Sequence, residues 1–426
     1  MAIKFSDLGI SKELETVLNK NGIKEPTPIQ QKSIPELFKG KDIIAQAQTG
    51  TGKTLAFLLP IIEKIDINKP HIQGLIITPT RELAIQITDE AKKFTAEKGI
   101  NILAAYGGQD VEQQVKKLKN GIHLVIATPG RLLDHMRRET VNLGKLQALV
   151  LDEADEMLRM GFLQDIEGIV GGTPKARQTM LFSATIPNEV RLLGTKFMKD
   201  PVQIEVQGTN VTLDEIKQVV LETTDRGKLD TLCQLIDEFR PYLAIVFCRT
   251  KKRVQSLNMD LAARGYNADE LHGDLSQGKR ERVMKSFKEA KIQILVSTDI
   301  AARGIDVEGI THVINYDIPD DAESYIHRIG RTGRIGNLGM AVTIVTDKDK
   351  DALALIERKI KMEFNPKKIE RKKNTDTKVQ EIRAKKESIN KKFGKNNNDK
   401  KDRFKRGKDS GAKKYAPSKK TSRKKI

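Results

Sequence analysis

The sequence predicts an α/β protein with two tandem domains, each a parallel β-sheet flanked by helices, followed by a basic tail. Three observations predict this fold class. The chain has 426 residues, more than one compact core usually holds. Short β-branched or apolar runs alternate with longer amphipathic stretches, as in parallel sheets covered on both faces. The positive charge lies at one end: residues 361–426 carry 26 Lys or Arg and 8 Asp or Glu, whereas residues 1–360 carry 50 and 49.

The first domain is expected over residues 1–207. Its strand-like runs are DIIA (42–45), GLIIT (74–78), LVIAT (124–128), ALVL (148–151) and TMLFS (179–183). Stretches between them, such as RELAIQITDEAKKF, have the periodicity of amphipathic helices. The pattern pauses at 201–213, so we expect a linker near residues 205–213.

The second domain is expected over residues 208–360. Its strand-like runs are AIVFC (244–248), QILVS (293–297), HVINY (312–316) and AVTIV (341–345). From residue 361 the apolar periodicity fades. The tail over 361–426 has too few apolar residues to offset the entropy of ordering, so it is predicted to be disordered.

Composition excludes several classes of protein. The only cysteines, Cys233 and Cys248, lie in apolar surroundings, which predicts buried reduced thiols and excludes a disulfide framework or a C-x-x-C metal site. The N-terminus lacks an apolar signal-peptide core, and no apolar run approaches the roughly 20 residues that span a bilayer. We therefore expect a cytoplasmic protein with no membrane partner. The histidines show no zinc spacing.

A phosphate-binding loop is predicted at AQTGTGKT (47–54), between the run DIIA and the helical pattern LAFLLPIIEKI. It departs from G-x-x-x-x-G-K-[ST] at Ala47 only. Gly50 and Gly52 permit torsions in which several N–H groups face one anion at a helix N-terminus. Lys53 would reach the β- and γ-phosphates, and the Thr54 hydroxyl would bind Mg²⁺. The predicted nucleotide-binding residues of this loop are Gln48, Thr49, Gly50, Thr51, Gly52, Lys53 and Thr54.

An acidic cluster follows the run at 148–151, where the sequence reads ALVLDEAD. Like charges this close raise one another's pKa unless a cation lies among them. Phosphate-bound Mg²⁺ would be that cation, held by Asp152, partly through water. Glu153 would orient or deprotonate the attacking water, and Asp155 would bond neighbouring hydroxyls. The alternative is a solvated acidic start to the helix EMLRM, which the helix dipole would favour; the upstream GTGKT argues against it.

Together with further segments, these two resemble the DEAD-box family of ATP-dependent RNA helicases, within helicase superfamily 2. The resemblance runs in order through about residues 5–346. Its segments are GIKEPTPIQ (22–30), AQTGTGKT (47–54), PTREL (79–83), Gly107-Gly108, TPGR (128–131), DEAD (152–155), SAT (183–185), IVFCRT (245–250), QGKR (277–280), STDIAARGID (297–306) and HRIGRTGR (327–334). One departure is Ile23, where the family usually carries an aromatic residue.

The resemblance implies two RecA-like domains with ATP and Mg²⁺ bound between them. Phe5 and Gln30 would contact the adenine, and Asp306 the ribose. Arg331 and Arg334 would act as arginine fingers on the γ-phosphate. Judged without the other motifs, these two arginines could instead face RNA phosphates.

Three residues are expected to couple the nucleotide state to RNA. The hydroxyls of Ser183 and Thr185 would bond Asp155, and His327 would tie the HRIGRTGR segment to DEAD. Surface capping by the hydroxyls and a neutral surface histidine are the alternatives.

RNA contacts are expected in loops that follow strands. Glycines permit close approach, threonines donate to phosphate or 2′-OH, and arginines pair with phosphate. By resemblance the contacts are Pro79, Thr80, Arg81, Gly107, Gly108, Thr128, Gly130, Arg131, Gln277, Arg280 and Thr298. TPGR taken alone also fits a simple helix start with proline at its first position.

The sequence thus predicts an ATP-dependent RNA helicase that couples RNA-stimulated ATP hydrolysis to domain closure, local duplex unwinding and remodelling of RNA or ribonucleoprotein. A DNA helicase or translocase, and a non-enzymatic RNA clamp, are the alternatives. The basic tail would add sequence-independent attraction to RNA; a targeting signal or an anchor for acidic surfaces is the other interpretation.

Overall fold

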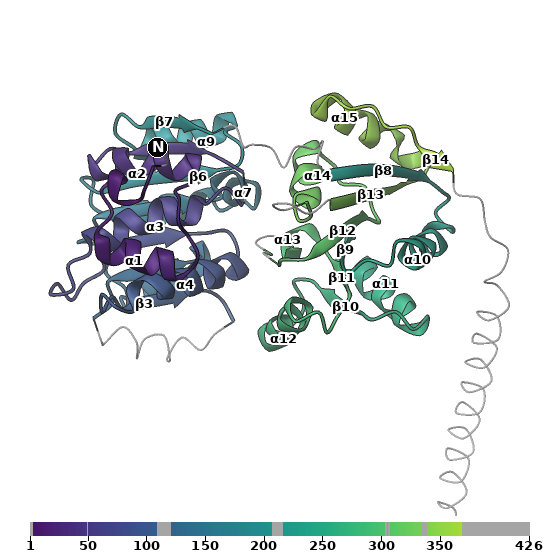
Figure 1. Cartoon of the computed structure of the whole chain (residues 1–426), viewed down its shortest axis with the longest axis horizontal. Coiled ribbons are helices and arrows are strands. Elements are labelled where there is room, and N and C mark those ends of the chain that lie inside the picture. Colours follow the sequence, from purple (N-terminus) through teal and green to yellow (C-terminus); the bar gives the residue numbers. More distant parts are fainter. Residues whose placement is uncertain are drawn as a thin grey trace, which may run out of the picture. The chain divides into compact units, whose positions relative to one another are not determined.

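The computed structural model describes residues 3–48, 50–108, 121–206, 216–302, 305, 307–333 and 339–368. Two seven-stranded sheets organise them (Figure 1). All strand pairings among these residues are parallel. The predicted fold class, two α/β domains on parallel sheets, is confirmed.

The first sheet has the strand order β3-β4-β2-β5-β6-β1-β7. Its strands are β1 (Ile43–Gln46), β2 (Gly74–Ile77), β3 (Ile102–Ala105), β4 (Leu124–Ala127), β5 (Ala148–Asp152), β6 (Gln178–Ser183) and β7 (Val202–Glu205). Its helices are η1 (Ser6–Leu8), α1 (Lys12–Lys20), α2 (Pro28–Phe38), α3 (Lys53–Lys64), α4 (Arg81–Thr95), α6 (Pro129–Arg137), α7 (Ala154–Arg159), α8 (Leu163–Gly171) and α9 (Asn188–Phe197).

Each face of this sheet is covered by an apolar layer. Alternate strand residues point to opposite faces, so Ile76 of β2 packs with α3 and α4, while its neighbours Leu75 and Ile77 pack with α6 and α8. This explains why the strands read as continuous apolar runs rather than as an alternating pattern.

The second sheet has the order β10-β11-β9-β12-β13-β8-β14. Its strands are β8 (Ile216–Glu222), β9 (Leu243–Phe247), β10 (Ala268–Leu271), β11 (Ile294–Ser297), β12 (Ile310–Asn315), β13 (Gly339–Val345) and β14 (Lys367–Lys368). Its helices are α10 (Lys228–Phe239), α11 (Lys251–Ala263), α12 (Gln277–Lys288), α13 (Asp299–Ala302), α14 (Ala322–Ile329), η2 (Asp347–Asp349) and α15 (Lys350–Ile360).

The nine predicted strands are all present, and five further strands were not predicted. β3 and β10 are edge strands; ADEL of β10 lacks a continuous apolar run, whereas ILAA of β3 is a short apolar run that the sequence prediction did not include. β7 lies in the predicted pause, β8 just after it, and β14 in the predicted tail. Most of the predicted linker lies outside the described residues.

The packed chain continues past residue 360, where we expected the tail to begin. Phe364 lies 6.2 Å from Tyr325 between ring centroids, and β14 pairs with β8. The predicted disorder beyond Lys368 falls outside the described residues. Cys233 and Cys248 are buried and unbonded to each other, as predicted. No helix in the described part of the chain combines the length and apolarity needed to cross a bilayer.

Candidate functional site

The loop between β1 and α3 is shaped by two glycines. Gly50 and Gly52 have φ values of 84° and 90°, a left-handed conformation that favours glycine. A Cβ on Gly52 would lie 2.6 Å from Nε2 of Gln30, so a larger residue would clash there. Gly52 caps the N-terminus of α3, which leaves backbone N–H groups available to an anion. Thr51 donates to the Gln48 carbonyl at 2.8 Å; Thr49 lies outside the described residues.

Lys53 begins α3 with a buried ammonium. The side chain is 7% exposed, and its Nζ has no hydrogen-bond partner among the described residues. Buried polar groups are nearly always hydrogen-bonded, because an unpaired one loses its hydration without compensation. The unpaired donor at a helix N-terminus therefore fits a phosphate.

The acidic cluster lies at the end of β5 and is buried. Asp152, Glu153 and Asp155 are 3%, 8% and 4% exposed, so a solvated acidic helix start is excluded. Burial raises the pKa of Asp152 to about 7, the charge of Lys53 opposes that rise, and the charges of Glu153 and Asp155 add to it. A cation bound here would favour the ionised carboxylate.

Glu153 has an unusual backbone conformation. Its φ of 53° is left-handed, which is uncommon for a residue with a side chain, and it immediately precedes α7. Such strain concentrates at functional sites. Its N–H donates to Oδ1 of Asp152 at 3.1 Å, which orients the Asp152 carboxylate toward the start of α7.

Asp155 is bonded to the end of β6, where we expected Ser183 and Thr185 to meet it. Thr185 donates to Oδ2 of Asp155 from its hydroxyl at 2.7 Å and from its N–H at 2.9 Å. The N–H of Asp155 donates to the Ser183 hydroxyl at 3.1 Å. Burial would raise the pKa of Asp155, but these hydrogen bonds outweigh burial and hold its pKa below the usual range.

Gln30 and Phe5 differ in how they fit the predicted adenine contacts. Gln30 accepts from the N–H of Thr27 at 2.9 Å and donates to the Gly52 carbonyl at 2.9 Å, so it braces the phosphate loop. Phe5 is 0% exposed and packs in the apolar layer that contains Leu8 and Leu14. The contact between Phe5 and adenine stays a prediction, and in this structure its ring lies wholly within that apolar layer.

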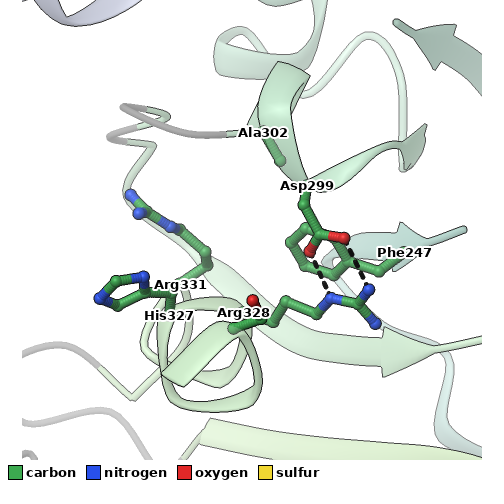
Figure 2. A pocket seen from close by; sticks show the side chains of 7 residues that line it. Phe247, Asp299, Ala302, His327, Arg328 and Arg331 are labelled. Atoms are coloured by element: carbon green, nitrogen blue, oxygen red, sulfur yellow. Dashed lines mark hydrogen bonds and ion pairs between the residues drawn. The ribbon is translucent and has the colours of Figure 1, made fainter. Parts of the chain in front are cut away.

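The HRIGRTGR segment contributes to a small pocket in the second domain (Figure 2). The pocket is lined by Phe247, Asp299, Ala302, Ser324, His327, Arg328 and Arg331. Nη1 of Arg331 donates to the Ile305 carbonyl at 3.1 Å. His327 lies 3.0 Å, from Nδ1 to Oε1, from Glu156, the residue that follows DEAD, rather than from one of the three predicted carboxylates. Arg334 and Asp306 lie outside the described residues.

Sequence reasoning missed Arg328 and its partner Asp299, although both lie inside matched segments. Two hydrogen bonds join the Arg328 guanidinium to the Asp299 carboxylate, at 2.5 and 2.7 Å (Figure 2). The available signal was a carboxylate two residues after the strand at 293–297 and an arginine on the buried side of an amphipathic helix.

Three other predicted RNA-contact residues, Gly107, Gly108 and Gln277, lie around Arg81. A Cβ on Gly107 or Gly108 would lie 2.7 or 2.9 Å from the Arg81 guanidinium, so these glycines permit its close approach. Nη1 of Arg81 donates to Oε1 of Gln277 at 3.2 Å. Thr80 is buried and caps α4 by accepting from the N–H of Leu83 at 3.3 Å.

The other residues predicted to contact RNA differ in how far they are free of protein partners. Gly130 has open space where a Cβ would point, and Nη1 of Arg131 is buried without a hydrogen-bond partner among the described residues. Thr128 precedes Pro129, the first residue of α6, so the helix-start interpretation of TPGR also holds.

Two candidates in the second domain are largely buried. Thr298 is 9% exposed. The Arg280 guanidinium already donates to Glu82 at 2.9 Å from Nε and to the His272 carbonyl at 3.1 Å. The contact between Arg280 and RNA stays a prediction, and in this structure the guanidinium is bonded to protein groups.

Comparison with known proteins agrees with this geometry. The model of the DEAD/DEAH box helicase family matches residues 27–193, and that of the helicase conserved C-terminal domain matches residues 227–336. The ATP-dependent RNA helicase CshA of Limosilactobacillus reuteri is 50% identical over 364 residues, which cover 85% of this chain and 73% of that protein. The chain belongs to the DEAD-box helicase family.

Other relatives of this DEAD-box helicase support the assignment. The DEAD-box ATP-dependent RNA helicase CshA of Bacillus anthracis is 50% identical over 361 residues, covering 85% of this chain and 68% of that protein. Mss116p bound to single-stranded RNA and AMP-PNP superposes with a TM-score of 0.81 at 30% identity, covering 90% of this helicase and 82% of that chain. Dbp5 of S. cerevisiae bound to RNA and ADP BeF3 superposes with a TM-score of 0.79 at 31% identity, covering 91% of this helicase and 99% of that chain.

Proposed function

We propose that this DEAD-box helicase is an ATP-dependent RNA helicase that couples RNA-stimulated ATP hydrolysis to local unwinding of RNA duplexes and to remodelling of RNA or ribonucleoprotein. The observation that carries the proposal is the buried, unpaired ammonium of Lys53 beside the buried carboxylate of Asp152. A nucleotide phosphate would pair with the ammonium, and a cation with the carboxylate. The names of the relatives supply the expected RNA substrate.

The phosphate loop binds ATP through charge and backbone donors. The N–H groups that precede and begin α3 hold phosphate oxygens, and Lys53 neutralises the β- and γ-phosphates. Gln30 keeps the loop in place through the Gly52 carbonyl. Asp306, outside the described residues, contacts the ribose.

Thr54 and Asp152 are the proposed Mg²⁺ ligands, with water in some positions. The bound ion would neutralise charge on the phosphate oxygens. Within the described ranges, no three His, Cys, Asp or Glu side chains converge on a possible metal site. That fits an ion that takes one carboxylate from the protein and its other ligands from phosphate and water.

Hydrolysis then needs a base and a counter-charge. Glu153 would accept a hydrogen bond from the attacking water and take up its proton as the water oxygen bonds to the γ-phosphorus and the bond from that phosphorus to the bridging oxygen breaks, which releases ADP. Arg331 and Arg334 stabilise the charge that develops on the transferred group and the leaving oxygen. Asp155, through Ser183 and Thr185, links the acidic cluster to the end of β6.

RNA is bound through its backbone. Arg81, Gly107, Gly108 and Gln277 form one cluster, and Arg131 offers an unpaired guanidinium nitrogen in another. Such contacts favour phosphate and sugar over base edges, so little sequence preference is expected.

In this proposal residues 1–207 and 208–360 are the two domains that close on ATP and RNA. The basic residues of 361–426 tether RNA and its protein partners. The setting is the cytoplasm, where both substrates are present.

The first experiment is ATP hydrolysis by the full chain, measured without nucleic acid, with a generic single-stranded RNA, and with the same sequence as DNA. We expect strong stimulation by RNA alone. Equal stimulation by DNA would favour a DNA helicase or translocase. Saturable RNA binding that depends on ATP but gives no turnover would identify a clamp and refute the enzymatic proposal.

A further inference from the structure

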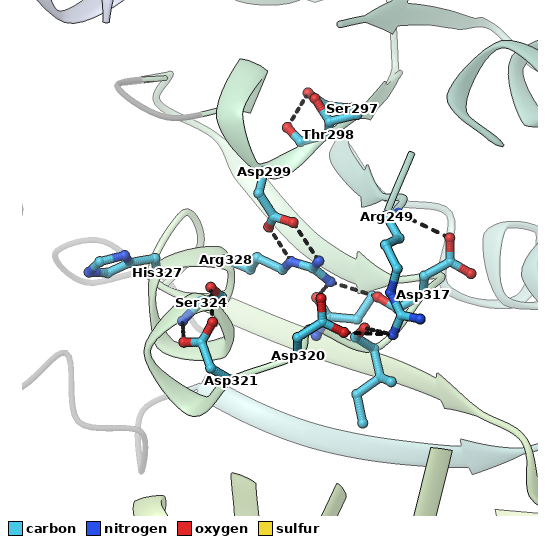
Figure 3. Close-up of polar contacts among 12 residues, drawn as sticks. Arg249, Ser297, Thr298, Asp299, Asp317, Asp320, Asp321, Ser324, His327 and Arg328 are labelled. Carbon is cyan, nitrogen blue, oxygen red and sulfur yellow. Dashed lines mark hydrogen bonds and ion pairs between the residues drawn. The ribbon is translucent and has the colours of Figure 1, made fainter. Parts of the chain in front are cut away.

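The side chain of Arg328 is enclosed by protein groups on every edge. Nε and Nη2 donate to the Asp299 carboxylate, and Nη1 donates to Oδ1 of Asn315 at 3.2 Å and to the Asp317 carbonyl at 2.6 Å (Figure 3). The guanidinium lies over the Phe247 ring, 5.0 Å from its centroid. Arg328 is only 3% exposed.

These partners come from the carboxyl ends of three neighbouring strands. Phe247 ends β9, Asn315 ends β12, and Asp299 follows β11 by two residues. Arg328 itself belongs to α14, so one side chain joins that helix to the three strand ends. A buried ion pair is weak evidence for stability, because apolar residues of similar volume often serve as well. Its significance is therefore in what it holds in place.

On one side the ion pair fixes the proposed RNA contact. Thr298 directly precedes Asp299 (Figure 3). The Ser297 hydroxyl donates to the carbonyls of Leu271 and Thr298, at 3.0 and 3.1 Å. The start of α13 is thus held by its own strand and by Arg328.

On the other side the ion pair fixes the proposed nucleotide contact. Arg331, which Figure 2 shows beside His327, follows the end of α14 by two residues and donates to the Ile305 carbonyl. The segment after β11 is therefore attached to the C-terminal end of α14 at Asp299, through Arg328, and at Ile305, through Arg331.

We propose that Arg328 and Asp299 form a positioning pair that couples RNA binding at Thr298 to the placement of Arg331 at the nucleotide. The two-point hydrogen bonding of a guanidinium and a carboxylate fixes orientation as well as distance. A shift of the start of α13 on RNA binding is therefore transmitted to α14. This inference rests on the proposed function.

The test uses Asp299→Asn and Arg328→Lys in the full chain, with Asp320→Asn as the matched control. Asp320 also pairs with an arginine, Arg249, at 3.1 Å, but its side chain is 79% exposed. We measure thermal unfolding, the KM for ATP, and kcat with and without poly(U) RNA. Because the phosphate loop is untouched, the KM for ATP should stay within about twofold, and the basal rate should fall less than the RNA-stimulated rate. The RNA-stimulated kcat should fall about 10- to 100-fold, the usual effect of misplacing a group in a transition state.

The inference is overturned if both variants keep the RNA stimulation of the Asp320→Asn control. It is also overturned if basal and stimulated rates fall by one common factor, since that would indicate a merely structural role. Arg328→Lys retains the buried positive charge, so it decides the question should Asp299→Asn unfold. Failure of the proposed function would look different: the unmutated chain itself would show no RNA stimulation, and both ideas would fall.

Discussion

At the scale of the residue, Lys53 illustrates a conflict between stability and binding. Its unpaired buried ammonium costs free energy in the nucleotide-free protein and is paired only when phosphate binds. Lys53→Met should therefore abolish ATP binding and raise the free energy of unfolding of the nucleotide-free protein by about 1–3 kcal/mol. Isothermal titration with ATP and urea unfolding measure the two effects.

The same substitution at the other end of α3 is the control. Lys64 donates to the Leu37 carbonyl at 2.6 Å and to Oε1 of Gln178 at 3.0 Å. Lys64→Met should keep ATP binding and lower stability by about 1 kcal/mol, since it breaks hydrogen bonds that are satisfied. A loss of stability in Lys53→Met as well would show that the attraction between its charge and ionised Asp152 outweighs the cost of the unpaired ammonium.

Asp152 should make stability depend on pH. Its pKa is raised from 3.8 to about 7, mainly by burial. Between these values the folded protein holds a proton that the unfolded chain has lost, so the free energy of unfolding falls as pH rises from about 4 to about 7. The fall is roughly 1.4 kcal/mol for each unit of pKa difference.

Urea unfolding at about pH 5 and about pH 7.5, without nucleotide or Mg²⁺, tests this dependence on Asp152. Asp152→Asn cannot ionise and should lose this part of the pH dependence. If the free energy of unfolding falls equally in the unmutated chain and in Asp152→Asn, the pH dependence belongs to another group.

At this scale the sequence indicates which residues can take part in the chemistry, but not which protein groups they contact in the folded chain. The acidic cluster and phosphate loop were recognisable because their residue types and order are local features. Phe5 and Arg280 were assigned to ligands, yet one is enclosed by the apolar layer and the other is bonded to Glu82. Burial and long-range pairing depend on the tertiary fold, which local spacing does not encode.

At the scale of the element, strand ends determine where the active groups lie. The runs that became β1, β2, β4, β5 and β6 were predictable because both faces of their sheet are covered. β10 was not predicted because an edge strand needs less apolar surface, and β3 because half of its short run ILAA is alanine, which is depleted in strands. The pairing of β6 with β5 is parallel and brings Ser183 close to the start of α7, so strand order explains the contact with Asp155.

The link between β6 and α7 can be tested by removing one hydroxyl. Thr185→Val should lower the free energy of unfolding by about 1–3 kcal/mol, because it leaves a buried charged acceptor with fewer donors. Thr195→Val is the matched control on α9, where the hydroxyl donates to the Arg191 carbonyl at 3.1 Å near the surface. That change should stay within about 0.5 kcal/mol. Equal losses would mean that the bond to Asp155 contributes nothing special.

At the scale of the whole molecule, charge and packing divide the chain at different places. The distribution of Lys and Arg puts the start of the basic tail at residue 361. Packing continues to Lys368, because several interactions anchor residues 361–368. Among them, the N–H of Phe364 donates to Glu357 at 2.7 Å, its ring lies near Tyr325, and β14 extends the sheet. Short anchoring segments of this kind carry little apolar periodicity, so composition alone placed them in the tail.

Two truncations separate these boundaries. A chain that ends at Lys368 should unfold at the same urea concentration as the full chain but bind RNA with a weaker dependence on salt. The slope of log K against log salt should decrease by about 0.7 for each RNA phosphate that the tail would have neutralised. A chain that ends at Ile360 should show the same weaker salt dependence and, in addition, lose about 2–3 kcal/mol of stability. This second truncation removes the Phe364 ring and exposes the edge of β8. If both truncated chains unfold alike, residues 361–368 contribute no stability and the packed domain ends where the charge distribution places it.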